Sequence, residues 1–291
     1  MPEPKRNMGA SVRARLLALA KERGQTLDLL LTRYALERLL YRLSTTKYRD
    51  RFVLKGAMLM TTWFDKPFRP TRDLDFLGFG DSDPQKVLAA FREICGMAMD
   101  DGVVFDLGVL EIDQIRDEAE YGGLRLKTYA DIGGARVRVV VDVGFGDAIE
   151  PAIIELEYPV LLDLPAPKLR AYPPETVMAE KFEAVVKLGQ ANSRMKDFYD
   201  MWLLTREHTF EGAALARAIA ATFARRKTGI PTERPIGLTM TFADDPAKQQ
   251  QWKSFANAIG TELPTLGEVI EELAEFIMPY AVTAARFTAA A

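Results

Sequence analysis

FVLKGAMLM at residues 52–60 and TRDLDF at residues 71–76 decide the fold of this 291-residue chain. The first stretch predicts a short strand over residues 51–54 and, after a glycine, an apolar helix over residues 58–64 that packs behind it. The second stretch predicts another strand, over residues 73–77. Together they predict an α/β (α+β) fold built on a small mixed sheet.

Two aspartates share one face of the second strand. Side chains of a strand alternate between its faces, so Asp73 and Asp75 project on the same side while Leu74 and Phe76 enter the core. Adjacent carboxylates repel each other unless a cation or solvent lies between them. Mg²⁺ binds one or two carboxylates together with phosphate oxygens, as in phosphoryl-transfer sites. The alternative is a solvated strand end, because an Asp-x-Asp pair is common by chance.

A glycine and a third acid extend this pattern. Gly56, between a strand and a helix, lets backbone N–H groups approach a phosphate at the helix N-terminus, although a glycine there can also serve only as a turn residue. Asp142 lies inside the apolar strand predicted over residues 136–143, where an unpaired buried carboxylate is costly. It either joins the two aspartates or pairs with Arg136 or Arg138.

A lysine and an aspartate form a second candidate cluster. On a helix predicted over residues 176–188, Lys181 shares a face with apolar residues, a position that lysines avoid unless paired. Its ammonium group can hold the phosphates of a nucleotide, or its stem can pack while the charge reaches water. On the next helix, Asp197 is placed to accept a proton or to orient the lysine. Alternatively, Asp197 and its charged neighbours at helical spacing form only an ion-pair ladder on the surface. These neighbours are Arg194, Lys196 and Asp200.

The remaining chain divides by its local patterns. Prolines concentrate over residues 150–175, which predicts a linker or edge crossing between units. A last helix begins at the capping-box residues Thr265 to Glu268 and is expected to stop at Pro279. The other predicted elements are two helices within residues 8–44, a helix over 83–99, strands over 124–129 and 136–143, and helices over 176–188, 193–205 and 212–226.

Composition indicates a folded chain without internal disulfides. Apolar residues make up 48% and charged residues 27%, with a mean hydropathy of -0.07, the balance of a globular protein. No apolar run reaches the roughly 18 residues of a membrane-spanning helix, and the first residues lack a signal-peptide core. We therefore expect a cytoplasmic protein without membrane contact. Cys95 and His208 are the single Cys and His of the chain, which argues against Cys/His zinc sites and Cys–His catalysis.

Charge is unevenly distributed along the chain. Residues 1–55 carry 13 Lys and Arg against 5 Asp and Glu, a net charge of +8, and the remainder carries -11. Clustered basic residues can bind nucleic-acid phosphates, so this segment is a candidate surface for an RNA acceptor. The alternative, given equal weight, is a solvated basic helical face packed on an acidic neighbour.

These motifs together resemble the AbiEii/AbiGii toxin family, the nucleotidyltransferase-like toxins of type IV toxin–antitoxin systems within the DNA polymerase beta-like superfamily. The resemblance covers residues 50–205. FVLKGAMLM is similar to the family's opening motif, with Lys55 and Gly56 matching. RPTRDLDF is similar to its Arg-x-Thr-x-Asp-Leu-Asp-Phe signature, and RMKDFYDMW to its Arg-x-Lys-Asp motif with a following Tyr-Asp.

The resemblance implies a role for each matching residue. Asp73 and Asp75 would bind the metal and take part in catalysis, with Asp142 in VVVDVGFGD as a third metal ligand. Lys181 in ETVMAEKFEAVV would be the essential lysine, and Asp197 the functional acid of the last motif. The implied nucleotide-binding set is Lys55, Gly56, Ala57 and Lys181. Ala57 replaces the family's second Gly or Ser, which removes a hydroxyl from this site while backbone contacts remain.

Together with the local patterns, the resemblance predicts domains and a reaction. The domains are an N-terminal helical region at residues 1–44, a nucleotidyltransferase-type sheet domain at 45–160 and a helical C-terminal domain at 161–291. The reaction would be Mg²⁺-dependent transfer of a nucleotide from an NTP to an acceptor hydroxyl of RNA, with the tRNA 3′ end as one substrate class. A cognate antitoxin would neutralise the toxin. The alternatives are a metal-dependent glycosyltransferase, whose Asp-x-Asp binds a nucleotide-sugar diphosphate, and a non-catalytic module that binds a nucleotide or partner.

Overall fold

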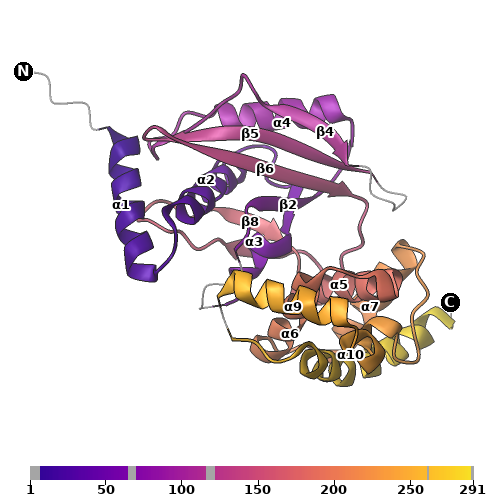
Figure 1. The fold of residues 1–291 in the computed structure, drawn as a ribbon. Coiled ribbons are helices and arrows are strands. Elements are labelled where there is room, and N and C mark those ends of the chain that lie inside the picture. The colour runs from indigo at the N-terminus through magenta and orange to yellow at the C-terminus, as the bar shows by residue number, and fades with distance from the viewer. Residues whose placement is uncertain (1–6, 65–69, 116–121, 261, 290–291) are drawn as a thin grey trace, which may run out of the picture. The chain divides into compact units, whose positions relative to one another are not determined.

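The structure, a computed structural model, describes residues 7–64, 70–115, 122–260 and 262–289. The chain forms two compact units, whose elements are labelled in Figure 1. We call Met1–Gly146 with Ile154–Ala171 the sheet unit, and Asp147–Ile153 with Tyr172–Ala291 the helical unit. The chain therefore crosses between the units more than once.

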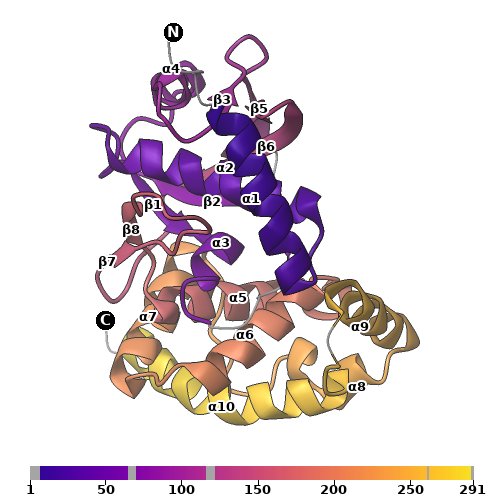
Figure 2. The same ribbon diagram turned by 90° about the vertical axis from the view of Figure 1, so that its left-hand side faces the viewer.

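Among the described residues, the sheet unit is built on one mixed sheet of eight strands (Figures 1 and 2). The strands pair in the order β3-β5-β6-β2-β1-β8-β7, and β4 pairs with β5 outside this path. Their bounds are β1 (Phe52–Lys55), β2 (Asp73–Gly78), β3 (Val103–Phe105), β4 (Glu111–Ile115), β5 (Gly123–Ile132), β6 (Ala135–Phe145), β7 (Ile154–Glu157) and β8 (Lys168–Ala171). The strand that carries the two aspartates, β2, thus lies between β1 and β6 at the centre of the sheet.

Helices cover the apolar face of this sheet. α2 (Leu27–Ser44) contacts β5, β6 and β8, α4 (Pro84–Gly96) contacts β3 and β4, and α1 (Met8–Arg23) contacts α2 and β5. Phe52 of β1 packs on Phe91 of α4, with 5.1 Å between ring centroids. Buried residues alternate along β5 and β6 with residues that keep contact with solvent, as expected for strands with one covered face. The alternation leaves the charged residues of β5 and β6 on the opposite face.

Part of the basic N-terminal segment is buried. Arg38 and Arg42 are each 1% exposed. Arg42 donates to both carboxylate oxygens of Asp101, at 2.7 and 3.1 Å, and Arg38 lies 2.9 Å from Glu37. These two arginines pack against acidic neighbours, as the alternative expected, but they are buried and not solvated. The basic side chains of α1 are exposed.

The helical unit has its own apolar core. α5 and α10 both contact α7, and α10 also contacts α6. Phe182 of α5 packs on Phe223 of α7, with 5.4 Å between ring centroids. No helix in the described part of the chain has both the length and the apolar character needed to cross a membrane. The helices are α5 (Pro174–Leu188), α6 (Met195–Glu207), α7 (Gly212–Arg225), α8 (Met240–Ala243), α9 (Pro246–Ile259) and α10 (Leu266–Ala289).

The predicted mixed α/β fold is confirmed, but the linker expected over residues 150–175 is wrong in part. This segment contains β7 and β8. β8 pairs in parallel with β1, and β7 pairs antiparallel to β8. Its prolines lie outside the two strands, so the ladder hydrogen bonds that proline would remove are kept.

The end predicted for the last helix is also wrong. α10 continues through Pro279 to Ala289. A proline inside a helix costs about 3 kcal/mol, but Ile277 and Ala281 on either side are fully buried, and this packing keeps the helix intact. β3, β4, α8 and α9 were not predicted from the sequence. β3 and α8 are short, β4 buries none of its residues, and α9 buries only Lys248 and Trp252.

Candidate active site

A row of four charged residues crosses the centre of the sheet. Lys55 of β1 is the register partner of Asp75 on β2, Asp75 is the partner of Asp142 on β6, and Asp142 is the partner of Arg125 on β5. Register partners lie on the same face of a sheet. Asp73 lies on this face too, two residues before Asp75. The strand of Asp142 therefore pairs with the strand of Asp73 and Asp75, which is the condition for the three acids to lie near one another.

Asp142 is held by Arg125, a residue that the sequence analysis missed. Nε and Nη2 of Arg125 donate to the two carboxylate oxygens of Asp142, at 2.7 and 2.6 Å. These hydrogen bonds, together with the charges of Asp142, Asp73 and Asp75, raise the pKa of Arg125 above its usual value. The guanidinium group thus offsets part of the negative charge on this face.

The hairpin turn is the sequence signal that could have identified Arg125. Gly133-Gly134, both at positive φ, form a two-residue loop between β5 and β6, the loop length that most strongly fixes hairpin register. Counting back from this loop places Arg125 opposite Asp142. Arg136 and Arg138, the partners considered from the sequence, lie on the same strand as Asp142 and form no hydrogen bond or ion pair with it within the described structure.

Gly56 begins the short helix α3 (Gly56–Met60) directly beside the carboxylate of Asp75. Its φ of +71° lies in the left-handed region, which favours glycine. A Cβ atom at this position would lie 2.7 Å from Asp75 Cγ and 2.8 Å from Asp75 Cβ, closer than non-bonded carbons approach. Only glycine at position 56 therefore allows the chain to turn this closely around the aspartate. Ala57, which follows it, is buried.

The carboxylates fit a divalent cation as a pair, with further ligands supplied from outside the protein. Within the described ranges, no group of three or more His, Cys, Asp or Glu side chains is arranged to hold a metal ion. Both oxygens of Asp142 accept hydrogen bonds from Arg125, and Asp73 Oδ1 accepts one from Thr71 at 2.7 Å. Mg²⁺ joins substrate phosphates through one or two carboxylates, and that Asp73 and Asp75 are these carboxylates stays a prediction. The role of Asp142 as a third metal ligand stays a prediction.

Lys181 is held by two buried aspartates within the helical unit. Its Nζ donates to Asp197 Oδ1 at 2.9 Å and to Asp200 Oδ2 at 2.7 Å. The Lys181 side chain is 12% exposed and the two aspartates 1% and 0%, so the ammonium group does not extend to water. Arg194 Nε lies 2.6 Å from Asp197 Oδ2, without the alignment of a hydrogen bond. Asp197 and Asp200 therefore form a buried cluster with Lys181 instead of part of a surface ladder, whereas Arg194 and Lys196 are exposed.

Burial and charge act in opposite directions on this cluster. Burial lowers the pKa of Lys181, but Asp197 and Asp200 outweigh it, so the pKa is raised above its usual value. Burial raises the pKa of Asp197, but Lys181 and Arg194 outweigh it, so this pKa is lowered. An ammonium group has three N–H donors, of which the described aspartates take two. Lys181 thus stays charged at neutral pH, and binding of a phosphate by its third N–H stays a prediction.

A family model described as nucleotidyl transferase AbiEii toxin, Type IV TA system, matches residues 38–279. The chain belongs to this family. The matched range includes all the candidate residues, from Lys55 to Asp197. The AbiEii resemblance stated from the sequence motifs is therefore confirmed.

Two crystal structures from Helicobacter pylori are similar to this AbiEii chain. One is a candidate nucleotidyltransferase, with 15% sequence identity and a TM-score of 0.48, and the match covers 91% of this chain and 98% of that one. The other is JHP933, with 15% identity and a TM-score of 0.47, covering 91% and 95%. A comparison with curated proteins found no match.

The residues that the AbiEii motifs single out lie in both units. Asp73, Asp75 and Asp142 belong to the sheet unit, and Lys181 and Asp197 to the helical unit. The structure brings the members of each set together within their own unit. That the two sets meet around one nucleotide stays a prediction.

Proposed function

We propose that this AbiEii protein transfers a nucleotide from an NTP to an acceptor hydroxyl of RNA, with the tRNA 3′ end as the acceptor. The observation that carries the proposal is the contact of Gly56 with the Asp75 carboxylate. It places the turn into α3 beside a pair of acids whose chemistry fits Mg²⁺. A triphosphate uses both features, because its oxygens accept hydrogen bonds from backbone N–H groups and its charge requires a cation.

In the proposed reaction, the acceptor oxygen attacks the α-phosphorus in line. The bond from this phosphorus to the oxygen that bridges to the β-phosphate breaks, and pyrophosphate leaves with the electron pair. The proton of the acceptor hydroxyl passes to solvent water. Asp73 and Asp75 would hold Mg²⁺, which would supply positive charge against the phosphates. Gly56, Ala57 and Lys55 position the triphosphate at the end of β1.

The cluster in the helical unit supplies a fixed positive charge for the same substrate. Lys181 binds the phosphates of the NTP with the N–H donor that its two aspartates leave available. Asp197 Oδ1 accepts from Lys181, and Asp197 Oδ2 lies against Arg194. These contacts favour a positioning role for Asp197, in which it orients Lys181 and keeps it charged, over the alternative that it accepts the proton of the acceptor hydroxyl.

Membership in a type IV toxin–antitoxin family implies an antitoxin as the partner of this protein. We propose that transfer to RNA inhibits growth and that the cognate antitoxin neutralises this effect. Co-expression tests this part. The wild-type protein expressed alone should inhibit growth, and co-expression of the antitoxin should restore it. The Asp75→Ala variant should not inhibit growth even without the antitoxin.

The activity is tested by incubating the protein with each labelled NTP, Mg²⁺ and total RNA. Asp75→Ala and Lys181→Ala are each expected to abolish the transfer of label to RNA. The controls are Asp100→Ala and Lys187→Ala, which change exposed residues and should label RNA as the wild type does. Full labelling by Asp75→Ala or Lys181→Ala would refute the assignment. Label transfer that needs a nucleotide-sugar would instead indicate a glycosyltransferase, and binding without product a non-catalytic module.

A further inference from the structure

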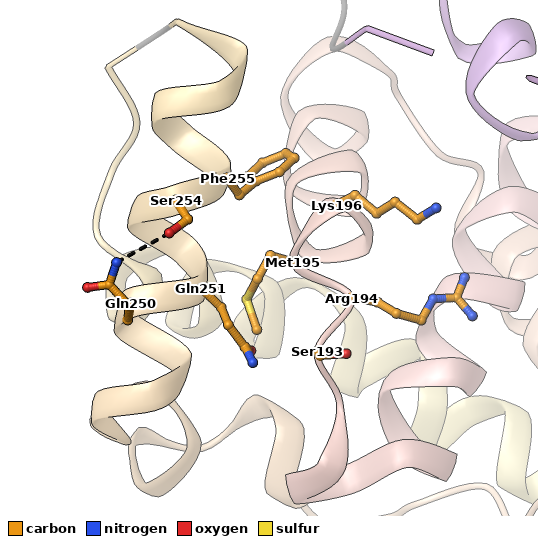
Figure 3. A pocket seen from close by; sticks show the side chains of 8 residues that line it. All are labelled: Ser193, Arg194, Met195, Lys196, Gln250, Gln251, Ser254 and Phe255. Carbon is orange, nitrogen blue, oxygen red and sulfur yellow. Dashed lines mark hydrogen bonds between the residues drawn. The ribbon is translucent and has the colours of Figure 1, made fainter. Parts of the chain in front are cut away.

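A pocket of about 490 Å³ in the helical unit has no part in the proposed reaction (Figure 3). One wall is formed by residues 193–196, at the start of α6. The other is formed by Gln250, Gln251, Ser254 and Phe255 of α9. Its volume lies within the range of roughly 300–1,000 Å³ that is typical of small-molecule pockets.

Hydrogen bonds hold the two walls together. Lys248 of α9, only 7% exposed, donates to the backbone oxygen of Asn192 at 2.8 Å. Gln190 donates to Asp245, the N-cap of α9, at 2.9 Å. The side-chain oxygen of Asn192 accepts from the backbone N–H of Arg194 at 2.8 Å. The pocket is therefore preformed, and a ligand loses little free energy to ordering its walls.

The pocket combines apolar, amide and cationic groups. Figure 3 shows Met195, Gln251 and Phe255 facing the space between the walls, whereas the side chains of Arg194 and Lys196 extend away from α9. The interior is thus lined by apolar surface and an amide, and the charged ends of Arg194 and Lys196 lie away from it. This arrangement suits a ligand with a flat, partly apolar body and a hydrogen-bonding edge.

Two buried polar atoms, one lining the pocket and one next to its first wall, have no hydrogen-bond partner within the described part of the chain. The amide oxygen of Gln251 is buried and has no hydrogen-bond partner among the described residues, and the same is true of the side-chain nitrogen of Asn192, next to the first wall. Leaving a buried polar group unpaired costs about 1–3 kcal/mol, so such groups are rare in native proteins. A ligand with an N–H donor would satisfy Gln251.

We propose that this pocket binds one nucleotide unit, with its base against Met195 and Phe255 and a base N–H on the amide oxygen of Gln251. Nucleobases have both an apolar face that stacks on aromatic side chains and an edge that forms hydrogen bonds. The choice of ligand class rests on the proposed function, in which nucleotides are both substrate and acceptor. The unit can belong to an RNA chain or to a free nucleotide, and the experiment separates these sources.

The test measures binding without catalysis. Wild type and variants are titrated in EDTA with a fluorescein-labelled oligoribonucleotide of mixed sequence and, separately, with labelled AMP, CMP, GMP and UMP. Gln251→Leu is expected to weaken binding about tenfold, the effect of losing one hydrogen bond in a buried site. The matched control is Gln249→Leu, because Gln249 is an exposed glutamine on the same helix that does not line the pocket.

Each outcome decides the proposal. A loss seen with the oligoribonucleotide alone supports an RNA ligand, and a loss seen with mononucleotides supports a free nucleotide. Equal binding by the wild type and Gln251→Leu, equal loss in Gln249→Leu, or no binding of either probe would overturn the pocket assignment. Thermal unfolding confirms that each variant is folded. Asp75→Ala should bind both probes normally while losing transfer activity, so a failed pocket and a failed transferase are distinguishable.

Discussion

Gly56 packs directly against the carboxylate of Asp75. The glycine starts α3 with a φ of +71°, and a side chain there would overlap the aspartate. The contact joins the turn after β1 to the central strand β2, so the position of the turn and the position of the acid depend on each other. The same contact is the basis of the proposed nucleotide site.

Gly56→Ala should therefore both destabilise the protein and abolish transfer. The added methyl group cannot fit beside Asp75 without moving β2 or the turn. Gly80→Ala is the matched control, because Gly80 also has a positive φ, of +81°, but nothing lies within 4 Å of a Cβ atom there. The control should cost only the left-handed conformation, about 1–2 kcal/mol. Urea unfolding gives the free energy of unfolding of each variant. Equal losses in the two variants would show that the added methyl group at position 56 is not destabilised by Asp75.

Arg125→Met should lower the free energy of unfolding by about 1 kcal/mol or more, since it leaves Asp142 unpaired beside Asp75. Arg138→Met is the control, because Arg138 is exposed on the neighbouring strand and has no described ion pair with Asp142. A double-mutant cycle with Asp142→Asn isolates the interaction. Additive effects of the two substitutions would contradict the coupling of Arg125 to Asp142.

Lys181→Met should destabilise the helical unit by about 3–5 kcal/mol, because it leaves Asp197 and Asp200 as buried carboxylates without their cation. Lys187→Met, on an exposed position of the same helix, should cost less than about 0.5 kcal/mol. The free energy of unfolding is measured by denaturant titration near neutral pH. If the triple variant that also carries Asp197→Asn and Asp200→Asn is no more stable than Lys181→Met, the buried charges are not the cause.

Stability should depend on the ionisation of Glu37. This residue is 1% exposed, and burial raises its pKa from 4.5 to about 7. Since the folded pKa lies above the unfolded one, the contribution is complete below about pH 4.5 and is lost as the pH rises through about 7. The loss is on the order of 3 kcal/mol.

Glu37→Gln should remove this slope, whereas Glu157→Gln, at an exposed position on β7, should retain it. The measurement is a series of urea unfolding curves between pH 4 and pH 8. An unchanged slope in Glu37→Gln would assign the pH dependence to other groups. Glu37 also accepts a hydrogen bond from the backbone N–H of Leu161 at 2.7 Å, so the glutamine should keep the loop in place.

The separate parts of the candidate site could be predicted from sequence to different extents. Strand alternation in TRDLDF was enough to place Asp73 and Asp75 on one face. The hairpin loop contained the register that pairs Arg125 with Asp142, although the sequence analysis did not use it. The two aspartates that bind Lys181 had the right spacing on one helix, but nothing local showed that α5 and α6 pack with this lysine between them. The wall that α9 contributes to the pocket could not be predicted, because that helix has almost no apolar stripe.

By itself, the sequence determined where β1, β2, β5, β6 and most helices lie, which faces are apolar and which motifs carry the chemistry. These features depend on side-chain periodicity, turn residues and caps, which act over a few neighbouring residues. Only the tertiary structure decided which charge pairs with which, why residue 56 must be glycine, and where a buried amide oxygen without a described partner lies at a preformed pocket. Those properties arise between residues far apart in the chain, where burial and distance set the energies.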